Sequence, residues 1–498
     1  MQTPAHWTSD PLTPPDARAW DLLIIGGGTA GLVAAHTAAG FGASVLLVER
    51  EHTGGDCLWT GCVPSKSLLA AAHVAAEARA ASRLGVHVGE LRVDFGAVME
   101  HVRSAITTIA PVDSPEALRR AGARVAQGEV VLTGPSTAEV DGTAVHFRQA
   151  LLATGSEPIV PGIPGLTEVD PLTSDSVWGL TELPASLLVL GGGAIGCELG
   201  QGFARLGSRV TVVEAEARLL GRESRAASAA LANAFAADGI DVRTGVAVTG
   251  VSTTDDGTRR VELADGSSVL VEQVLVAIGR RPRTRHLGLT AAGVEVTDSG
   301  HVRVDERLRT TSPRIWAAGD LTSHPPFTHT AGSHGSLAAS NAVLGLRRTV
   351  RPDLVPRVTY TQPEVAAFGP DVDDPGPGRT VRRIPHTEVD RAVAEGRTDG
   401  YSALVLDAKG RVIGASIVGP RAGESLAEAV LAGHEAIRAR GLAGSMHAYP
   451  TWSDGVWKAG LAQGRADLAS PVVQRVTRGL AALRRQWTGR QWTGRGLD

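Results

Sequence analysis

The chain has 498 residues, of which 43% are hydrophobic and 20% are charged, and its formal net charge at pH 7 is -3. At roughly 150 residues per domain, this length predicts about three domains, and the apolar content is enough for several cores. Binding of nucleic acid relies on a basic field, which this charge balance does not supply, so we expect no nucleic-acid partner.

Neither export nor membrane insertion is indicated. Residues 1–18 are polar and rich in proline, which predicts a disordered tail, and they lack the basic and apolar regions of a signal peptide. No run approaches the roughly 18 apolar residues of a membrane span. Three cysteines are too few for the disulfide framework of a secreted protein. We therefore expect a soluble, cytoplasmic protein with no membrane partner.

A strand–turn–helix pattern typical of dinucleotide binding begins at residue 21. An apolar run precedes Gly26, Gly28 and Gly31, an Ala-rich helix follows, and the next apolar run ends at Glu49. The glycines permit a tight turn, close approach of the backbone to a pyrophosphate, and close helix–strand packing, while the acidic residue accepts from a ribose hydroxyl.

The same pattern recurs at residues 187–214, with Gly191, Gly193, Gly196 and Glu214 in the corresponding places. In both copies the glutamate follows the last glycine by 18 residues. One such motif is weak evidence, but two copies in full context predict two doubly wound α/β domains with two dinucleotide sites.

Two of the three cysteines, Cys57 and Cys62, lie between these patterns in the run GGDCLWTGCVPSK at residues 54–66. A dithiol close to a dinucleotide site can exchange electrons with the bound cofactor, and its thiolate is the reactive form. The alternative is a structural disulfide or a pair of inert core thiols. Cys197 is expected to be a small packed side chain, and no ligand cluster suits a metal ion.

Further elements follow from periodicity. Residues 65–84 predict a helix, residues 100–121 a helix with a break at 113–115, and residues 127–152 short strands with tight turns. After about residue 350, strands alternate with two helices. The chain ends in a basic tail that repeats Gln-Trp-Thr-Gly-Arg at 486–490 and 491–495, and we expect this tail to be disordered.

Together these motifs resemble the class I pyridine nucleotide-disulfide oxidoreductases, which include dihydrolipoamide dehydrogenase, glutathione reductase and mercuric reductase. The resemblance spans about residues 19–465 and includes the segments 153–155, 279–282, 318–320 and 359–366. It implies two Rossmann-like dinucleotide-binding domains plus a C-terminal α+β dimerisation domain. It also implies a homodimer, the commonest symmetric oligomer, in which the partner's C-terminal segment completes the active site.

The resemblance implies a division of the chain into six parts. These are a tail (1–18), the first part of the FAD domain (19–155), the NAD(P) domain (156–282), the second part of the FAD domain (283–350), the interface domain (351–470) and a basic tail (471–498).

The resemblance also assigns the cofactors, FAD and NAD(P)H. FAD is expected to contact Gly26, Gly28, Gly31, Glu49, Gly55, Lys66, Thr154, Gly155, Asp320 and Ala331. The nicotinamide nucleotide is expected to contact Gly191, Gly193, Gly196, Glu214 and Gly279. Because Glu214 would repel a 2′-phosphate, NADH is preferred over NADPH, although Arg218 is close enough in sequence to weaken that preference.

The family pattern gives the redox residues distinct roles. Cys62 takes electrons from the flavin, and Cys57 attacks the substrate disulfide. Lys66 stabilises the negative charge of the reduced flavin, and Glu198 pairs with Lys66. The plain alternative is a surface lysine and a solvated helix glutamate.

The C-terminal segment departs from the family. Where the family has His-Pro-Thr followed by Glu, this chain has Tyr449-Pro450-Thr451 followed by Asp454. Tyrosine, with a pKa of about 10, is a poor base at neutral pH, although it can donate a proton. His447 would share a face with Tyr449 on an extended segment and is the alternative base. The catalytic candidates here are therefore His447, Tyr449 and Asp454.

The predicted function is an FAD-dependent NAD(P)H:disulfide oxidoreductase similar to dihydrolipoamide dehydrogenase, with a small-molecule or protein disulfide as substrate. One alternative is a quinone or diaphorase-type flavin reductase with a vestigial dithiol. Another is a mercuric reductase-like enzyme, disfavoured because that group carries a C-terminal cysteine pair and no cysteine follows Cys197 here. A third is a non-catalytic flavoprotein that senses redox state.

Overall fold

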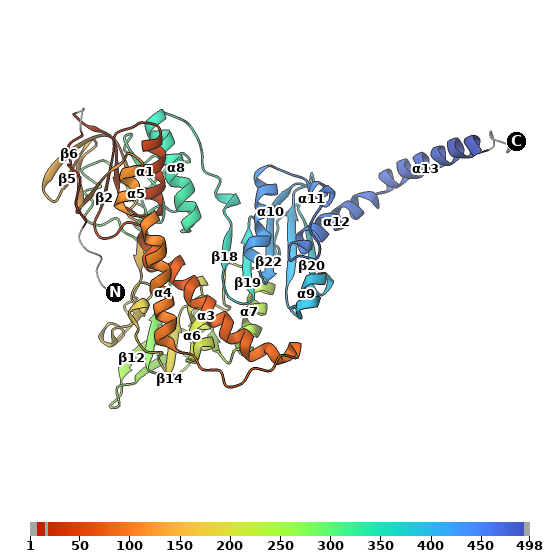
Figure 1. Ribbon diagram of the computed structural model, residues 1–498, viewed down its shortest axis with the longest axis horizontal. Coiled ribbons are helices and arrows are strands. Elements are labelled where there is room, and N and C mark those ends of the chain that lie inside the picture. The colour runs from red at the N-terminus through yellow and green to blue at the C-terminus, as the bar shows by residue number, and fades with distance from the viewer. Residues whose placement is uncertain (1–6, 15–17, 493–498) are drawn as a thin grey trace. The chain divides into compact units, whose positions relative to one another are not determined.

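The computed structural model describes residues 7–14 and 18–492, with side chains up to residue 488. The chain divides into two compact units (Figure 1). The first contains residues up to Arg222, Leu231–Val355 and Thr359–Gln362, and the second contains Glu223–Ala230, Pro356–Val358 and the chain from Pro363 onward.

One parallel sheet of the first unit is built from two distant parts of the chain. The strands β1 (Trp20–Ile25), β2 (Val45–Glu49), β3 (Arg124–Gln127), β6 (Thr143–Leu152) and β17 (Ile315–Ala317) lie in the order β3-β2-β1-β6-β17. The strands are apolar because both faces are covered. The helices α1 (Thr29–Gly40) and α8 (Thr328–Leu344) pack together closely (Figure 1), since a Cβ on Gly335 would lie 2.2 Å from Ala30 O.

An antiparallel layer continues this sheet. β4 (Val130–Gly134) pairs with β5 (Thr137–Val140), which pairs with the first half of β6. These are the short strands expected between residues 127 and 152, and their turn at Asp141-Gly142 places both residues at positive φ.

The second parallel sheet has the order β11-β10-β9-β15-β8. Its strands are β8 (Leu172–Thr173), β9 (Ser186–Leu190), β10 (Arg209–Glu214), β11 (Asp241–Thr244) and β15 (Gln273–Val276), and α6 (Ala194–Leu206) follows β9. A separate antiparallel sheet contains β12 (Val248–Thr253), β13 (Arg259–Leu263) and β14 (Ser268–Val271). The two connections between the parallel-sheet domains pair with each other as β7 (Ser156–Pro158) and β16 (Arg280–Pro282).

The helices after the first motif follow the predicted pattern with shifted ends. α2 (Gly55–Trp59) precedes α3 (Cys62–Ala80), which continues as a 3₁₀ turn to Leu84. The second helical region is α4 (Phe95–Ile109) and α5 (Pro115–Arg120), interrupted near the predicted break. α4 begins earlier than expected because Asp94 caps it by accepting from Ala97 N–H at 2.9 Å.

The second unit is an α+β domain. Its sheet has the order β18-β19-β22-β21-β20, from β18 (Arg357–Thr359), β19 (Glu364–Phe368), β20 (Thr380–Pro385), β21 (Tyr401–Leu406) and β22 (Val412–Gly419). Its helices include α9 (Asp390–Glu395), α10 (Ala422–His434), α11 (Ala439–Gly444), α12 (Asp454–Leu468) and α13 (Pro471–Trp492).

The described residues near each end of the chain form contacts or a helix where tails were expected. Asp10 accepts from Val125 N–H and Arg119 Nε, both at 2.9 Å, so residues next to it are held against the first sheet rather than forming a free tail. Residues 471–492 are helical, because Pro471 begins the helix favourably and few breakers follow. The end of the second QWTGR repeat lies outside the described residues. Among the described helices, none combines the length and the apolar character needed to cross a membrane.

Candidate active site

The first glycine motif is fixed by contacts that a side chain would block. Gly26 has φ +107°, and a Cβ there would lie 2.5 Å from Ala153 O. A Cβ on Gly31 would lie 2.0 Å from Gly26 O. Glu49 closes the motif by accepting from Gly27 N–H at 2.6 Å. Only glycine fits the two crowded positions.

The second motif repeats this geometry. Gly191 has φ +114°, and its Cβ would lie 2.6 Å from Ala277 O, while that of Gly196 would lie 1.9 Å from Gly191 O. Glu214 accepts from Gly192 N–H at 2.6 Å. The two dinucleotide motifs predicted from sequence therefore adopt the same local structure.

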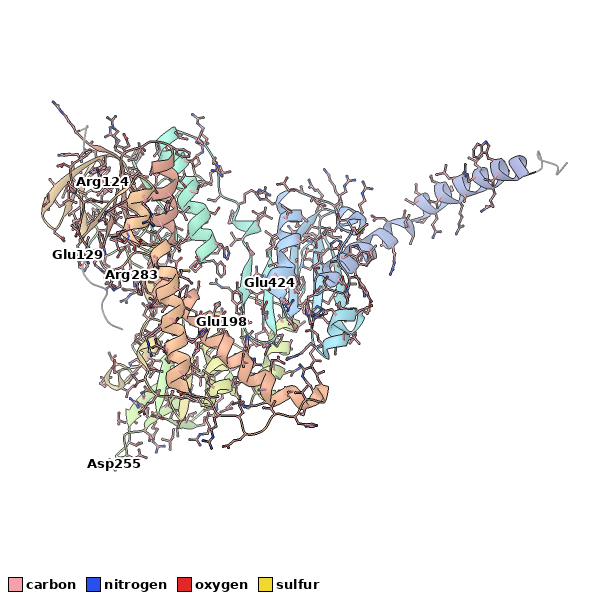
Figure 2. The ribbon with its side chains drawn as sticks, in the orientation of Figure 1. Arg124, Glu129, Glu198, Asp255, Arg283 and Glu424 are labelled. Atoms are coloured by element: carbon pink, nitrogen blue, oxygen red, sulfur yellow. The ribbon has the colours of Figure 1, made fainter. Side chains whose placement is uncertain are left out.

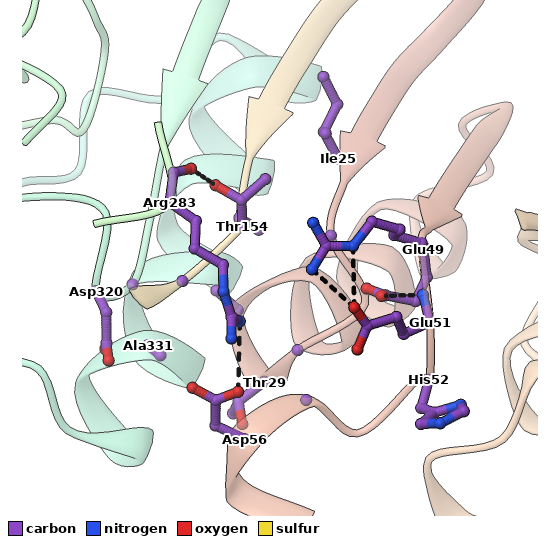
Figure 3. Close-up of a pocket in the computed structure, with 18 of the residues that line it drawn as sticks. Ile25, Thr29, Glu49, Glu51, His52, Asp56, Thr154, Arg283, Asp320 and Ala331 are labelled. Carbon is purple, nitrogen blue, oxygen red and sulfur yellow. Dashed lines mark hydrogen bonds and ion pairs between the residues drawn. The ribbon is translucent and has the colours of Figure 1, made fainter. Parts of the chain in front are cut away.

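A cavity of about 660 Å³ opens beside the first motif (Figure 3). Its lining includes nine of the residues expected to bind FAD or to act as the outer thiol, namely Gly26, Gly28, Glu49, Gly55, Cys57, Thr154, Gly155, Asp320 and Ala331. The other two residues expected to contact FAD, Gly31 and Lys66, do not line this cavity. Gly31 packs instead against Gly26 within the motif.

The cavity fits a dinucleotide. α1 begins at its edge with no side chain capping the first N–H groups, which leaves these donors for a phosphate. Gly28 and Gly55 both line the cavity and face each other so closely that a Cβ on Gly55 would come within 2.7 Å of Gly28 Cα, so no side chain separates the backbone from an approaching pyrophosphate there. In the second motif, α6 likewise has an uncapped N-terminus, and the space beside Gly193 is open.

The two thiols are brought together at the start of α3. Cys57 lies in α2 and Cys62 is the first residue of α3, and both are free thiols. A hydrogen bond from Cys57 lowers the pKa of Cys62 to about 6 against the opposing effect of burial, and Thr328 and Lys66 lower it further. The same hydrogen bond, with burial, raises the pKa of Cys57. The pair therefore holds its negative charge on Cys62 and its proton on Cys57.

Lys66 lies one helical turn after Cys62 and forms an ion pair with Glu198 of α6, the helix that packs against α3. Glu198 is labelled in Figure 2. The Lys66 Nζ to Glu198 Oε2 distance is 2.8 Å. Glu198 is only 6% exposed, and its other oxygen accepts from Tyr360 N–H at 2.9 Å. Lys66 Nζ also lies 4.3 Å from the centroid of the Tyr360 ring. Each oxygen of the buried Glu198 carboxylate thus has a partner, which offsets the free-energy cost of removing its charge from water.

A charge cluster beside the dithiol was not expected from the sequence. Asp56 forms an ion pair with Arg283 at 3.4 Å (Figure 3). It also forms an ion pair with Arg280, which lies 3.2 Å from Asp175. Burial raises the pKa of Asp56, although the two arginines oppose this shift. The one feature of the sequence that could have indicated this cluster is the position of Asp56 directly before Cys57.

The cluster reaches Asp320, in the segment 318–320, through Ser156. Arg280 Nε donates to Ser156 Oγ at 2.8 Å, and Ser156 Oγ donates to Asp320 Oδ2 at 2.9 Å. Thr154 Oγ1 donates to the carbonyl of Arg283 at 2.7 Å. The residues around the predicted Thr154 and Asp320 contacts are therefore joined to the segment that carries Cys57.

In the second unit, His447 is held between two acceptors. Its Nε2 lies 2.7 Å from Glu428 Oε1, and its Nδ1 lies 3.0 Å from Ser445 O. Burial lowers the pKa of His447, but the hydrogen bonds to Ser445 and Glu428 outweigh it and raise that pKa. Only the imidazolium can donate to both acceptors at once. Glu428 gave no sequence signal, because it lies on α10, 19 residues away.

The expectation that His447 and Tyr449 share one face requires correction. Tyr449 is 70% exposed and donates its hydroxyl hydrogen to Asp390 Oδ2 at 2.5 Å, whereas His447 turns toward α10. The chain bends at Tyr449 and Pro450 and does not remain extended. The hydrogen bond to Asp390 raises the pKa of Tyr449, so even less of the phenolate that could act as a base is present at neutral pH.

Asp454 does not hydrogen-bond to either candidate base in the described structure. It begins α12, is 2% exposed, and accepts from Thr451 Oγ1 at 3.2 Å. Its role in this geometry is to hold the turn before α12.

Comparisons with known proteins agree with this geometry. The family model "Pyridine nucleotide-disulphide oxidoreductase" matches residues 20–335, and the model of that family's dimerisation domain matches residues 355–459. The chain is 38% identical to a mercuric reductase from Streptomyces lividans, with 87% of this chain and 94% of that protein covered. It is 33% identical to a dihydrolipoyl dehydrogenase from Geobacillus stearothermophilus, with 86% and 93% covered.

Solved structures show the same fold. LpdA from Mycobacterium tuberculosis superposes with a TM-score of 0.82 at 27% identity, with 89% of this chain and 99% of that chain covered. The Cu(II) complex of RclA, an HOCl-induced flavoprotein disulfide reductase from Escherichia coli, gives a TM-score of 0.79 at 25% identity, with 90% of this chain and 100% of that chain covered.

Proposed function

Because the chain belongs to the pyridine nucleotide-disulphide oxidoreductase family, whose members use FAD and NAD(P)H, we propose that it reduces a disulfide substrate through Cys57 and Cys62. FAD, when bound, supplies the hydride acceptor and the two-electron relay between nicotinamide and disulfide. The observation that carries the proposal is the placement of two free thiols, Cys57 in α2 and Cys62 at the start of α3, with the Thr328 hydroxyl 3.2 Å from Cys62 Sγ.

Each turnover passes two electrons from the nicotinamide to the substrate. NAD(P)H delivers two electrons and one proton, which convert the Cys57–Cys62 disulfide into a Cys57 thiol and a Cys62 thiolate. Cys57 then loses its proton and attacks one sulfur of the substrate, forming a mixed disulfide and releasing the first thiol with that proton. The Cys62 thiolate attacks Cys57, restoring the disulfide and releasing the second thiolate, which takes one proton from outside the pair.

We assign His447 as the donor of the proton that the second substrate thiolate takes up. Its raised pKa extends the pH range over which the ring carries a proton, which suits an acid that assists a leaving thiolate. A proton donor favours reduction of a disulfide over oxidation of a dithiol, which needs a base. The family's dimerisation domain carries this residue, so the homodimer is the expected working form.

A second candidate is the reduction of a thiophilic metal ion. It is favoured by mercuric reductases among the relatives, at 38% and 35% identity, and by the Cu(II) complex of RclA. A lowered pKa of Cys62 provides a thiolate ligand for a soft ion. The lack of any cysteine after Cys197 argues against the usual delivery of mercury.

The test compares acceptors across cysteine variants of the purified holoenzyme. NAD(P)H oxidation is followed with lipoamide, glutathione disulfide, menadione or Hg²⁺ as acceptor in wild type, Cys57→Ser and Cys62→Ser. Cys197→Ser serves as the matched control, because it removes a buried thiol that hydrogen-bonds to Gly192 O within its own motif.

We expect turnover of a disulfide in wild type and in Cys197→Ser, and its loss in both dithiol variants. Retained menadione turnover in those variants, with no disulfide turnover in wild type, would establish the quinone-type reductase instead. Turnover of Hg²⁺ alone that depends on both cysteines would replace the disulfide substrate by a metal ion.

A further inference from the structure

The last helix, α13, lies outside the part of the chain that the family models match. The dimerisation-domain match ends at residue 459, whereas α13 runs from Pro471 to Trp492 and follows α12 (Figure 1). Its side chains are exposed or half-buried along the whole described length.

One face of α13 is an apolar stripe. It consists of Val472, Val476, Leu480, Leu483 and Trp487, which are 54–72% exposed. The spacings of 4, 4, 3 and 4 residues place all five within an arc of about 80° on a helix of 3.6 residues per turn. A stripe of five large apolar side chains exposed to water needs an apolar partner.

Outside the stripe, the only charged side chains of the described part of α13 are arginines. At the same helical period, Arg478 and Arg485 lie opposite the stripe, and Arg475 and Arg484 lie along its two edges. The guanidinium carbon of Arg484 is 4.5 Å from the centroid of the Trp487 ring. Between Asp467 and Asp498 the sequence contains no acidic residue, so the helix has a field of one sign.

We propose that α13 binds in the plane of an anionic lipid bilayer, with the apolar stripe inserted among the acyl chains and the edge arginines at the phosphate groups. An apolar face with tryptophan and leucine, bordered by arginine, is the pattern of interfacial helices. Arginine attraction to anionic headgroups adds to the burial of the stripe.

Two other partners fit less well. A nucleic acid would neutralise the arginines but leave the stripe of Val472, Val476, Leu480 and Leu483 in water. A second copy of α13 would cover the stripe, but it would bring Arg475 and Arg484 against the same residues of the partner with no carboxylate to pair them.

The experiment uses the full-length holoenzyme and co-sedimentation with vesicles. One vesicle set is phosphatidylcholine alone, and the other is an equal mixture of phosphatidylcholine and phosphatidylglycerol. We expect binding to the mixed vesicles, little binding to phosphatidylcholine, and release at about 1 M salt, where the Debye length falls to about 3 Å.

Variants separate the two contributions. Leu480→Ser/Leu483→Ser should weaken binding at least about tenfold by removing burial from the stripe. Arg475→Gln/Arg484→Gln, at the two edges, should weaken it roughly 30-fold on anionic vesicles only. Ala481→Ser/Ala482→Ser is the matched control, because it adds two serines to the same turn outside the stripe, and it should bind like wild type. NADH turnover, unchanged in all three, shows that the enzyme is folded.

Three results would overturn the proposal. The first is equal binding by wild type and the Leu480→Ser/Leu483→Ser variant. The second is binding to a short DNA duplex without binding to anionic vesicles. The third is a smaller oligomer for the leucine variant in light scattering, with no vesicle binding by wild type, which would assign the stripe to a second copy of the chain.

Discussion

The hydroxyl oxygen of Thr328 lies 3.2 Å from Cys62 Sγ. Cys62 is the first residue of α3 and Thr328 is the first residue of α8, so the N-terminal ends of two helices meet at one sulfur. Partial positive charge at a helix N-terminus stabilises a thiolate, and the Thr328 hydroxyl adds a hydrogen bond to it. The low pKa of Cys62, which is caused first by the hydrogen bond from Cys57, thus also depends on a residue 266 positions away in sequence.

Thr328→Val should raise the pKa of Cys62. The threonine hydroxyl lowers that pKa, which lies at about 6 with the hydroxyl in place. Loss of one hydrogen bond to a charged group is worth about 1.5 kcal/mol, or roughly one pH unit. The pH midpoint of the ultraviolet thiolate absorbance of the reduced enzyme measures this change. Thr328→Ser keeps the hydroxyl and should keep the midpoint, and an unchanged midpoint in Thr328→Val would show that Thr328 has no such role.

The twin glycine motifs provide a paired test of cofactor assignment. Gly31→Ala and Gly196→Ala each place a Cβ within 2.0 Å of a carbonyl oxygen, so both must distort the turn. We expect Gly31→Ala to be purified without FAD. Gly196→Ala should retain FAD but show an NADH KM raised at least about tenfold, as expected for about 1.4 kcal/mol of lost binding. Flavin absorbance and steady-state kinetics distinguish the two, and loss of FAD in Gly196→Ala would reverse the assignment of the sites.

Local sequence patterns predicted most of what depends on backbone geometry. Gly26 and Gly191 adopt a positive φ, and a Cβ on Gly31 or Gly196 would meet the carbonyl of the first glycine in the same turn, so both dinucleotide motifs could be located without a structure. The buried parallel strands were equally clear, because both of their faces are covered and their sequences are continuously apolar.

Contacts between distant segments could not be predicted in this way. Asp56 meets Arg280, 224 residues later, and Glu428 meets His447 from another helix. No periodicity links such pairs, since their meeting depends on how whole elements pack. The helical C-terminal segment was missed because its composition resembles that of a polar tail, whereas its apolar residues repeat at a helical period.

Nucleotide preference should depend on Glu214. Its two oxygens accept from Gly192 N–H at 2.6 Å and Glu216 N–H at 2.8 Å, which fixes the carboxylate where a ribose is expected. Arg218 donates to Gly221 O at 2.7 Å and is held by its own loop. We therefore expect wild type to prefer NADH, and Glu214→Ala to shift the ratio of kcat/KM for NADH over NADPH toward NADPH by at least about tenfold, since a like charge is removed.

Arg218→Ala is the companion variant for this prediction. If the guanidinium stays with its loop carbonyls, its removal should change the NADPH preference far less than Glu214→Ala does. A wild-type preference for NADPH that disappears in Arg218→Ala would contradict the assignment and identify Arg218 as the phosphate ligand.

The Glu428–His447 pair should set the alkaline limit of disulfide reduction. Glu428 stabilises the imidazolium and helps to raise the pKa of His447. Activity that needs the protonated ring is present below this pKa and is lost as the pH rises through it. In Glu428→Gln the pKa falls, so the loss of disulfide turnover should begin at lower pH, while menadione turnover keeps its profile.

The same pair should stabilise the folded protein at low pH and lose this effect as the pH rises. A histidine whose pKa is raised on folding stabilises the native state fully below its unfolded pKa of about 6.5, and this contribution disappears as the pH rises through the folded pKa. Glu428→Gln should therefore lower the thermal midpoint more at pH 5.5 than at pH 9. Tyr449→Phe is the matched control. It removes only the exposed Tyr449 hydroxyl, which donates to Asp390, and it leaves His447 in place. If Tyr449→Phe alone abolishes disulfide turnover and Glu428→Gln leaves both profiles unchanged, the proton comes from Tyr449 and His447 is a packing residue.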